Sequence, residues 1–583
     1  MAHWSENCNR LSLTTISLGD LDTLEPTEGG EGSVYLFCLP PSLSDNAATL
    51  STTGFNLIAH FCAKLPANAV VCVLATPPSA ARLLPILERS LKYQLWVAVK
   101  SVASSNTPPE GSLPQNHSAL LVLTRYSGAL QHTKTRIKYT YCPACKKTTK
   151  DYGGKKHIYH EYGTLMSDVW RDIECDPAHD IEAITDRLRD VFGVAPYKHL
   201  KVLDLRESLA FSFTENVETV RRKEQPQASA SALESRLLNA DCLEALKALP
   251  DNSIDFCFTD PPYNLQKKYD KWDDSLESIA YFEWCDAWLA ELYRVLKPNC
   301  TLAVLNIPLW AVRHYQKLAT LMQFQSWIVW EALGLPVRMI MPSHYALLCF
   351  SKGEPRPLPG LTNVGTPHEK TYLQPLGEGF CVRASCETGR RQVGISDTAE
   401  LGDIWADIHR LKHNSRRVDH PCQLPPHLLR RLFALFTKPN EIVLDCFNGA
   451  GTSTLVAVQM NRRYIGIEHS EQYHNLALQR HYQYECGQDP FEKTESVPQA
   501  KNSRVPRMPT QKYLVSKKQL QLEVRRIAKQ VGRLPTKEDV KAHSAYSLEY
   551  FEKYFSSWGE VCAAARTTGM SELPTSQLSL DVF

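Results

Sequence analysis

One short segment, residues 254–265, limits the choice of fold more than any other part of this sequence. A largely apolar run, Ile254 to Thr259, ends in the loop Asp260-Pro261-Pro262-Tyr263. Such a run predicts a buried parallel strand with the loop at its carboxyl end, where the active sites of open α/β sheets lie. The prolines fix the backbone and remove two amide donors. The carboxylate, the loop carbonyls and the aromatic face are suited to holding a planar ring that carries an amine; the alternative is a surface turn with a chance pair of prolines.

A second strand, loop and helix follow at residues 441–460. The strand ends at Asp445, the loop contains Gly449 and Gly451, and a further strand ends at Glu468. Glycines let a backbone approach a ligand closely, and an acid about 20 residues further on can bind ribose hydroxyls. This pattern predicts a nucleoside cofactor, because a phosphate ligand would favour more glycines or a Lys-Ser/Thr pair.

These segments resemble the β group of DNA amino-methyltransferases, which methylate exocyclic amines of adenine or cytosine. Asp-Pro-Pro-Tyr resembles the catalytic loop of that family. Residues 445–452, Asp-Cys-Phe-Asn-Gly-Ala-Gly-Thr, resemble its S-adenosylmethionine loop, usually Asp-Pro-Phe-x-Gly-Ser-Gly-Thr, from which Cys446 and Ala450 depart. Residues 420–425, His-Pro-Cys-Gln-Leu-Pro, resemble its His-Pro-Thr-Gln-Lys-Pro element, from which Cys422 and Leu424 depart. The resemblance covers residues 236–482, with the catalytic loop first, as in the β group.

The resemblance implies a Rossmann-like, mixed α/β methyltransferase sheet in a catalytic domain at residues 236–485. It implies S-adenosylmethionine as the cofactor. The cofactor contacts that it implies are Asp241, Gln423, Asp445, Phe447, Gly449, Gly451 and Glu468. Asp241 is also suited to a plain helix N-cap, and Ala240 before it departs from the family's glycine.

Site-specific methylation of a base flipped out of double-stranded DNA is the activity that the resemblance implies. Asp260 and the Pro261 carbonyl would accept the amine hydrogens while the base stacks on Tyr263. Aspartate in the loop favours adenine-N6, because cytosine-N4 enzymes more often carry serine there; cytosine-N4 is the alternative. A non-catalytic DNA-binding protein on a relic methyltransferase fold is a second hypothesis, and RNA or protein amines are a third.

Residues 30–225 look like a degenerate copy of the catalytic domain. Residues 33–42 align with the catalytic strand and loop, so that Leu39 replaces the aspartate and Ser42 the tyrosine. Four further segments align in the same order, beginning at Lys64, His117, Ser167 and Lys201. We expect this copy to bind no cofactor and to form the inactive half of an internal pseudo-dimer, so that the chain works as a monomer. The alternative is two ordinary α/β domains with similar strand patterns.

An insert in this copy, residues 141–162, contains Cys-x-x-Cys and then His-x-x-His. This spacing predicts a tetrahedral, structural zinc site formed by Cys142, Cys145, His157 and His160. The alternative is a basic DNA-contact loop, since five lysines lie between or beside these residues. Further along, Arg416 and Arg417 belong to a basic cluster that is suited to DNA contact or to a solvated face.

The end of the chain is predicted to be a separate helical module, residues 512–572, after a polar linker at residues 486–511. Gly-Arg-x-Pro-Thr, followed by Tyr-Phe-x-x-x-Phe-x-Ser-Trp, resembles the repeat found beside homing endonucleases. That resemblance implies DNA binding by a helix-turn-helix-like unit. The candidate phosphate contacts are Arg525, Arg526 and Arg533, and residues 501–570 hold 14 Lys/Arg against 6 Asp/Glu.

Composition sets the remaining expectations. The 583 residues suggest three or four domains, and no apolar run reaches the roughly 18 residues of a membrane span. The 18 cysteines are scattered and no secretory signal is recognised at the start, which predicts a reducing cytoplasm. A net charge of only +2 means that any nucleic-acid surface must be local.

Overall fold

The computed structural model forms two compact units, residues 1–500 and 501–583, and each is described by itself. The residues that the structure describes are 12–16, 32–40, 52–101, 109–125, 130–133, 135–137, 139, 141–142, 145–148, 164–177, 179–193, 197–206, 233–264, 277–332, 343–358, 373–375, 386, 388–389, 392, 398–408, 410–411, 423–491, 517–555, 558–559 and 561. Within the first unit we call residues 12–206 the first half and residues 233–491 the second half.

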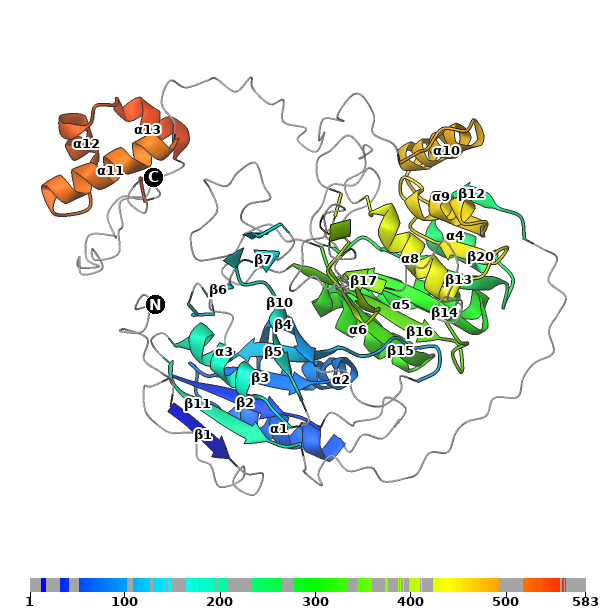
Figure 1. Ribbon diagram of the computed structural model, residues 1–583, viewed down its shortest axis with the longest axis horizontal. Helices are drawn as coiled ribbons and strands as arrows, with labels where there is room; N and C mark the ends of the chain where they lie inside the picture. Colours follow the sequence, from blue (N-terminus) through cyan, green and yellow to red (C-terminus); the bar gives the residue numbers. More distant parts are fainter. Residues whose placement is uncertain are drawn as a thin grey trace. The chain divides into compact units, whose positions relative to one another are not determined.

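The second half builds an eight-stranded sheet that carries both loops singled out in the sequence (Figure 1). In spatial order its strands are β12 (Arg236–Asn239), β21 (Arg463–Glu468), β20 (Ile442–Asp445), β13 (Ile254–Thr259), β14 (Leu296–Asn306), β16 (His344–Ser351), β15 (Gln323–Glu331) and β19 (Ile404–Trp405). Neighbouring strands are parallel except that β16 runs antiparallel to β14 and β15. This is the predicted Rossmann-like α/β architecture.

Helices cover both faces of this sheet, which explains why β13 is apolar on both sides. They are α4 (Cys242–Lys247), α5 (Ser278–Val295), α6 (Pro308–Ala319), α8 (Pro426–Phe436), α9 (Thr452–Gln459) and α10 (Glu471–Glu485). Phe256 of β13 stacks on Phe436 of α8 with ring centroids 5.7 Å apart. Cys257, which points to the other face, packs in a core that includes α5 and α6. The strand is therefore held from both sides, and its end is fixed in place.

The first half builds a seven-stranded sheet. In spatial order its strands are β1 (Ser12–Ile16), β11 (Tyr197–Asp204), β2 (Gly32–Cys38), β3 (Val70–Ala75), β5 (His117–Thr124), β4 (Lys92–Ser101) and β10 (Val169–Cys175). Its helices are α1 (Thr52–Lys64), α2 (Pro77–Leu87) and α3 (Glu182–Phe192). Because β1 begins at Ser12, this sheet reaches further towards the amino terminus than the predicted boundary at residue 30.

The two sheets follow the same plan. From β11 to β10 and from β20 to β19, the order, the strand directions and the single antiparallel strand correspond. The strand pairings do not give one residue-by-residue alignment of β2 with β13. Through β3 and β14, Phe37 corresponds to Thr259, whereas through β11 and β20, Cys38 pairs with Asp204 as Phe258 pairs with Asp445. The predicted match of Leu39 with Asp260 lies between these two alignments and stays a prediction, and Ser42, the predicted counterpart of the tyrosine, lies outside the described residues.

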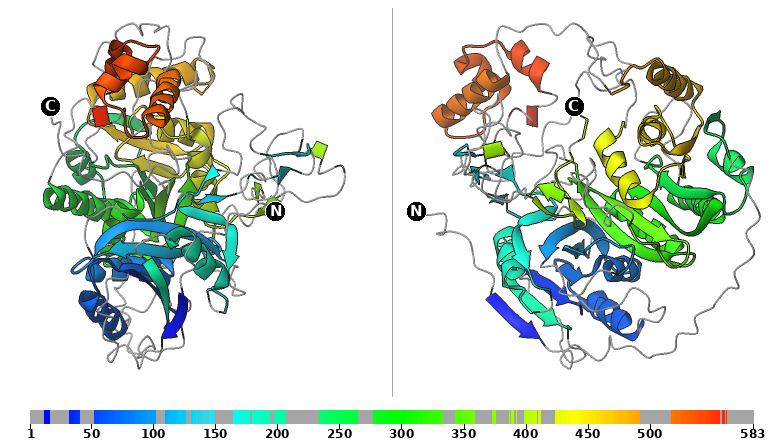
Figure 2. Two further views of the ribbon diagram at one scale, coloured as in Figure 1. Left: turned by 90° about the vertical axis from the view of Figure 1, so that its left-hand side faces the viewer. Right: turned by 45° about the vertical axis from the view of Figure 1, so that its right-hand side comes forward.

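The two sheets lie side by side in both views of Figure 2, and α2 packs against α6 across the boundary. Three short two-stranded sheets complete the unit. They pair β6 (Arg136–Ile137) with β9 (Thr164–Leu165), β7 (Tyr141–Cys142) with β8 (Lys147–Thr148), and β17 (Leu373–Pro375) with β18 (Thr398–Glu400).

The β7–β8 hairpin contains the Cys-x-x-Cys turn, with Cys145 between the strands. The two predicted histidine ligands, His157 and His160, lie outside the described residues. Among the residues that are described, no group of three His, Cys, Asp or Glu side chains is placed to hold a metal ion. The zinc site therefore stays a prediction.

The second unit contains three helices, α11 (Lys517–Val531), α12 (Lys537–His543) and α13 (Leu548–Tyr554). Its core includes Phe551 and Phe555, with Trp558 packed against it, as predicted. Thr536 begins α12 in a capping box with Asp539. No helix in the described parts of the chain is both long and apolar enough to cross a membrane.

Candidate active site

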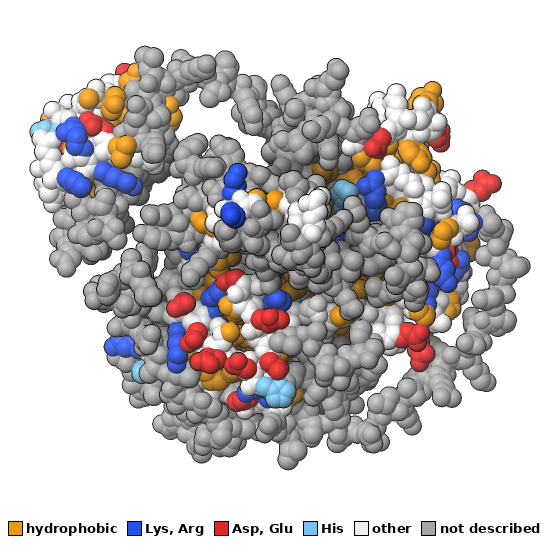
Figure 3. Space-filling model, viewed as in Figure 1, with side chains coloured by type: hydrophobic (Ala, Val, Ile, Leu, Met, Phe, Trp, Pro, Cys, Tyr) orange, Lys and Arg blue, Asp and Glu red, His pale blue; other side chains and the backbone are white. Residues whose placement is uncertain are grey.

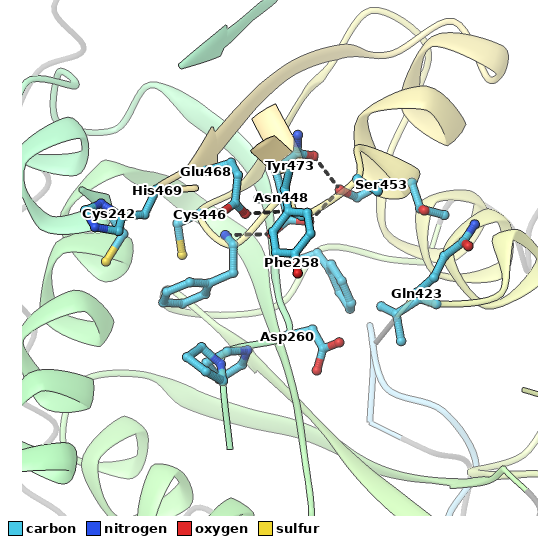
Figure 4. A pocket seen from close by; sticks show the side chains of 18 of the residues that line it. Cys242, Phe258, Asp260, Gln423, Cys446, Asn448, Ser453, Glu468, His469 and Tyr473 are labelled. Atoms are coloured by element: carbon cyan, nitrogen blue, oxygen red, sulfur yellow. Dashed lines mark hydrogen bonds between the residues drawn. The ribbon is translucent and has the colours of Figure 1, made fainter. Parts of the chain in front are cut away.

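A pocket lies at the carboxyl ends of β13, β20 and β21, where the sequence places its two loops. Its lining includes almost every predicted catalytic and cofactor residue: Asp241, Asp260, Pro261, Pro262, Tyr263, Gln423, Asp445, Phe447, Gly449 and Glu468. Figure 4 shows Gln423 and Glu468 on different sides of the pocket, with Tyr473 and Asn448 drawn between them. Parallel strands bring their carboxyl ends to one edge, which is why distant segments meet here.

The loop after β13 is anchored by aromatic donors from two helices. The Tyr281 hydroxyl of α5 donates to the Pro262 carbonyl at 2.7 Å, and Trp310 Nε1 of α6 donates to the Tyr263 carbonyl at 2.7 Å. The Tyr263 hydroxyl donates to Asp260 Oδ1 at 2.6 Å. The Pro261 carbonyl accepts no hydrogen bond from the described residues, so it and the carboxylate of Asp260 are the acceptors that face a ligand.

The glycine loop is shaped by two buried carboxylates. The Gly449 amide donates to Glu468 Oε2 and the Ser470 amide to Oε1, both at 2.8 Å. The Phe447 amide donates to Asp445 Oδ1 at 3.0 Å, and the Ser453 hydroxyl donates to Oδ2. Each acid therefore fixes the backbone of the loop beside it. Both acids also line the pocket.

Burial changes the proton affinity of both acids. It raises the pKa of Asp445 to about 7, against the hydrogen bonds from Ser453 and Phe447, and nearby Asp260 and Glu468 raise it further. Burial also raises the pKa of Glu468, which its backbone donors partly offset. Four carboxylates thus line one pocket, those of Asp241, Asp260, Asp445 and Glu468.

Asp241 satisfies both interpretations of its role. Its carboxylate caps α4 by accepting from the amides of Leu243 at 2.9 Å and Glu244 at 3.3 Å. The same residue lines the pocket. The N-cap fixes the carboxylate in place, so that the capping role and a ligand-binding role are compatible.

Gly451 is the predicted cofactor residue that is not part of the pocket lining. It has a φ of +76° and stands at the start of α9. A Cβ atom there would come within 2.9 Å of the Ala477 Cβ of α10. This glycine therefore allows the turn and the approach of α10, whereas Gly449, with a φ of +52°, faces the pocket.

Aromatic side chains missed by the sequence analysis complete the lining. Trp330 and Tyr345 stack with centroids 5.3 Å apart, and Tyr345 lies 6.0 Å from the Tyr263 ring. Arg410 lies over the Tyr345 ring at 5.8 Å. On the other side, Phe447 packs edge-on to Trp288. Only the pairing of β16 with β15 brings Trp330 and Tyr345 together, so sequence spacing carried no signal for them.

The predicted DNA contacts stay predictions. Arg416 and Arg417 lie outside the described residues. In the second unit, Arg533 forms a two-point ion pair with Asp539, and Arg526 pairs with Glu523. Arg525 is exposed on α11. Figure 3 shows lysine and arginine side chains gathered on the visible face of this module.

Comparisons with known proteins identify both regions. A family model described as DNA methylase matches residues 254–479, and one described as homing endonuclease associated repeat matches residues 515–565. A solved DNA modification methylase from Thermus thermophilus, complexed with S-adenosyl-L-methionine, is 20% identical over 42% of this chain and 92% of that chain, with a TM-score of 0.30.

Curated relatives match over a similar span. The type II methyltransferase M.BamHI of Bacillus amyloliquefaciens is 33% identical over 40% of this chain, which spans 54% of that relative's length. M.HpaI of Haemophilus parainfluenzae is 33% identical over 42% of this chain and 74% of its own length. Because this identity extends over 74% of M.HpaI, the chain belongs to the DNA methylase family of type II methyltransferases.

Proposed function

We propose that this protein transfers a methyl group from S-adenosylmethionine to the exocyclic N6 amine of an adenine in double-stranded DNA. The observation that carries the proposal is the meeting of Asp260 and the glycine-loop acids in one pocket. One acid lies where an amine acceptor is needed, and the others lie where a nucleoside cofactor would be held. Family membership supports the same reaction.

The residues around the glycine loop fit this cofactor. Glu468 and Asp241 offer carboxylate acceptors for hydroxyl and amine groups, and Phe447 offers an aromatic face. Asp445 and Glu468 add negative charge, which suits a ligand that carries a sulfonium cation. When bound, the cofactor supplies an electrophilic methyl group; the chain's own task is to place an amine nitrogen in line with it.

The catalytic loop would activate the amine without an enzyme nucleophile. Asp260 and the Pro261 carbonyl each accept one amine hydrogen, which makes the nitrogen lone pair available. The N–CH₃ bond forms as the S–CH₃ bond breaks, and the amine loses one proton to Asp260. Tyr263, whose hydroxyl donates to Asp260, keeps the carboxylate oriented and offers a ring on which the base can stack.

The base must leave the duplex to reach this loop. Tyr263, Tyr345 and Trp330 form an aromatic wall suited to a flipped base, and Arg410 stands beside it. Adenine is favoured over cytosine by the aspartate in the loop, following the family pattern noted above. The carboxyl-terminal module and its basic residues would add affinity for DNA through phosphate contacts.

Mass spectrometry of nucleosides tests the proposal directly. Unmethylated genomic DNA is incubated with the protein and S-adenosylmethionine, with Asp260→Ala in parallel. We expect N6-methyladenine from the wild type and none from the variant. N4-methylcytosine would correct the base and keep the mechanism. The absence of any methylated base, together with no cofactor binding in calorimetry, would refute the proposal and favour a DNA-binding protein.

A further inference from the structure

The boundary between the two halves is built by reciprocal contacts. The Asp403 carboxylate, just before β19, accepts from the Asn116 amide at 2.8 Å and lies 2.7 Å from His117 Nδ1. The Asp168 carboxylate, just before β10, accepts from the Ser343 amide at 2.8 Å. It also accepts from the Ser343 hydroxyl at 2.7 Å and lies 3.0 Å from His344 Nδ1.

These contacts obey an approximate two-fold symmetry. His117 begins β5 as His344 begins β16, so each half gives one histidine and one aspartate to the other. Between the two pairs, Trp96 of β4 stacks on Trp327 of β15 with centroids 4.5 Å apart and planes 2° apart. The two tryptophans occupy corresponding positions, because Trp96 pairs with Leu121 as Trp327 pairs with Leu348. A residue stacked on its own counterpart is what a two-fold axis produces.

One part of the boundary breaks this symmetry. Glu331, at the end of β15, forms an ion pair with Arg171 of the first half at 2.7 Å and accepts from Ser167 at 3.4 Å. The position that corresponds to Glu331 is Lys100, which pairs with Glu174 of its own half. The two corresponding positions therefore carry opposite charges, and Glu331 contacts the first half through Arg171 and Ser167.

The contacts of Asp168 and Arg171 lie directly beside the pocket. The residue after His344 is Tyr345, and the residue before Glu331 is Trp330; these are the two stacked rings of the aromatic wall. Glu331 pairs with His344 in the ladder, directly beside the Trp330–Tyr345 pair, so Asp168 and Arg171 contact both strands at one edge of that wall. The glycine loop lies on β20 and β21, at the other end of the same sheet, and receives no such contact from the described first-half residues.

We propose that the first half is a built-in positioning subunit, in which Asp168 and Arg171 hold the aromatic wall of the target-base pocket. This inference rests on the proposed function for the identity of the base. It assigns the first half a role that needs neither a cofactor nor a catalytic loop of its own. The face that a second copy would need for a two-fold dimer is already covered.

The test compares two substitutions in the first half. Asp168→Ala removes the acceptor for the Ser343 amide and hydroxyl, whereas Trp96→Leu removes the central stack, whose partner does not line the pocket. We expect Asp168→Ala to lower kcat at least tenfold while the cofactor Kd changes less than twofold. Asp168→Asn should recover part of that loss, because its amide oxygen still accepts from the Ser343 amide. Trp96→Leu should lower the Tm at least as much as Asp168→Ala does, but its kcat should stay within threefold of the wild type.

Two further measurements separate positioning from folding and from the proposed function. Arg171→Ala, at a partly exposed position, should lower kcat about threefold even if Asp168→Ala fails to fold. Hydrogen exchange should become faster in residues 328–332 and 343–347 of the Asp168 variant, and stay unchanged in residues 442–453. The inference would be overturned if Trp96→Leu lost as much kcat as Asp168→Ala. It would also be overturned if exchange and kcat were unchanged in both Asp168→Ala and Arg171→Ala. If the wild type transfers no methyl group, but the Asp168 variant still shows this change in exchange relative to the wild type, only the proposed function is refuted.

Discussion

The first and second halves share a sheet plan but differ at the strand ends that would do chemistry. β13 ends at Thr259 and leads through Asp260 into a loop held by two aromatic donors, whereas β2 ends at Cys38, a buried thiol whose pKa burial raises to about 12. A neutral thiol cannot serve as a carboxylate acceptor. Two sheets can therefore share one plan while their strand ends differ in chemistry.

The ends of β20 and β11 show the same contrast in charge. Both end in an aspartate, Asp445 and Asp204. In the first half Arg206 stands two residues further on, forms an ion pair with Asp204 at 2.6 Å and lowers its pKa. In the second half that position holds Phe447, and burial raises the pKa of Asp445 instead. Asp204 therefore has a cationic partner two residues away, whereas Asp445 is held by the Ser453 hydroxyl and the Phe447 amide.

The largest effect should come from exchanging the acceptor groups at these strand ends. We expect Asp260→Asn to lower methyl transfer at least a thousandfold, roughly 4 kcal/mol, because an amide accepts a proton poorly and places donors towards the amine. Cys38→Ser, the matched change in the first half, should leave the rate within twofold. Single-turnover transfer of labelled methyl to DNA measures both. A large loss of rate in Cys38→Ser would show that the first half takes part in the chemistry.

The pH dependence of stability should have opposite signs at the two aspartates. Because its folded pKa is raised to about 7, Asp445 contributes stability below pH ~4 that is lost as the pH rises towards 7. Asp445→Asn should therefore match the wild type near pH 4.5 and exceed it at pH 8, by up to roughly 4 kcal/mol in the cofactor-free protein. Asp204, with a lowered pKa, gives stability above pH ~4 that acid removes.

Thermal unfolding without cofactor checks this prediction, at pH 4.5 and pH 8 for Asp445→Asn and at pH 3 and pH 8 for Asp204→Asn. Asp204→Asn should be less stable than the wild type at pH 8, by no more than about 1 kcal/mol, since the ion pair is partly exposed. Its deficit should shrink as acid protonates the wild-type carboxylate. The same sign of pH dependence in both variants would contradict the proposed difference between the two strand ends.

Cofactor binding should be confined to the second half. Glu468 accepts from two backbone amides, and a glutamine there would direct its amide donor at one of them. We expect Glu468→Gln to weaken S-adenosylmethionine binding about 30-fold, roughly 2 kcal/mol, with one site per wild-type chain in calorimetry. Glu441→Gln, which alters an ion pair with Arg356 outside the pocket, is the matched control and should change the affinity less than twofold. Two sites per chain would be incompatible with an inactive first half.

Sequence alone located the two loops because each depends on residues next to one another. The apolar run before Asp260, and the glycines between Asp445 and Glu468, define a strand end and a turn wherever they occur. Their meeting followed from the rule that parallel strands share a carboxyl edge. The fold class and most of the pocket were therefore predictable, and so was the shared plan of the two halves.

The remaining features depend on registers that spacing does not reveal. The register of β2 relative to β13 is one example, since the pairings with their two neighbours give different alignments. Trp330 and Tyr345 come together only when β15 pairs with β16. Arg526 and Arg533 were chosen for their charge, but their acidic partners lie on the same helix or the next one and engage them locally. Local pattern predicts elements well, whereas cross-strand contacts and ion pairs require the assembled structure.

The smallest predicted effect concerns the third residue of α6 and of α2, two helices that begin with proline. α6 begins at Pro308 and places Trp310 on the Tyr263 carbonyl; α2 begins at Pro77, and the corresponding Ser79 donates its amide to Thr76 Oγ1 at 3.3 Å. Trp310→Phe keeps a ring but removes the donor, so we expect kcat to fall about fivefold, roughly 1 kcal/mol, with cofactor affinity unchanged. Ser79→Ala should lower the Tm slightly and leave kcat unaltered. If Trp310→Phe keeps full activity, the anchor on the Tyr263 carbonyl is dispensable, and the prolines and the Tyr281 hydroxyl suffice to fix the catalytic loop.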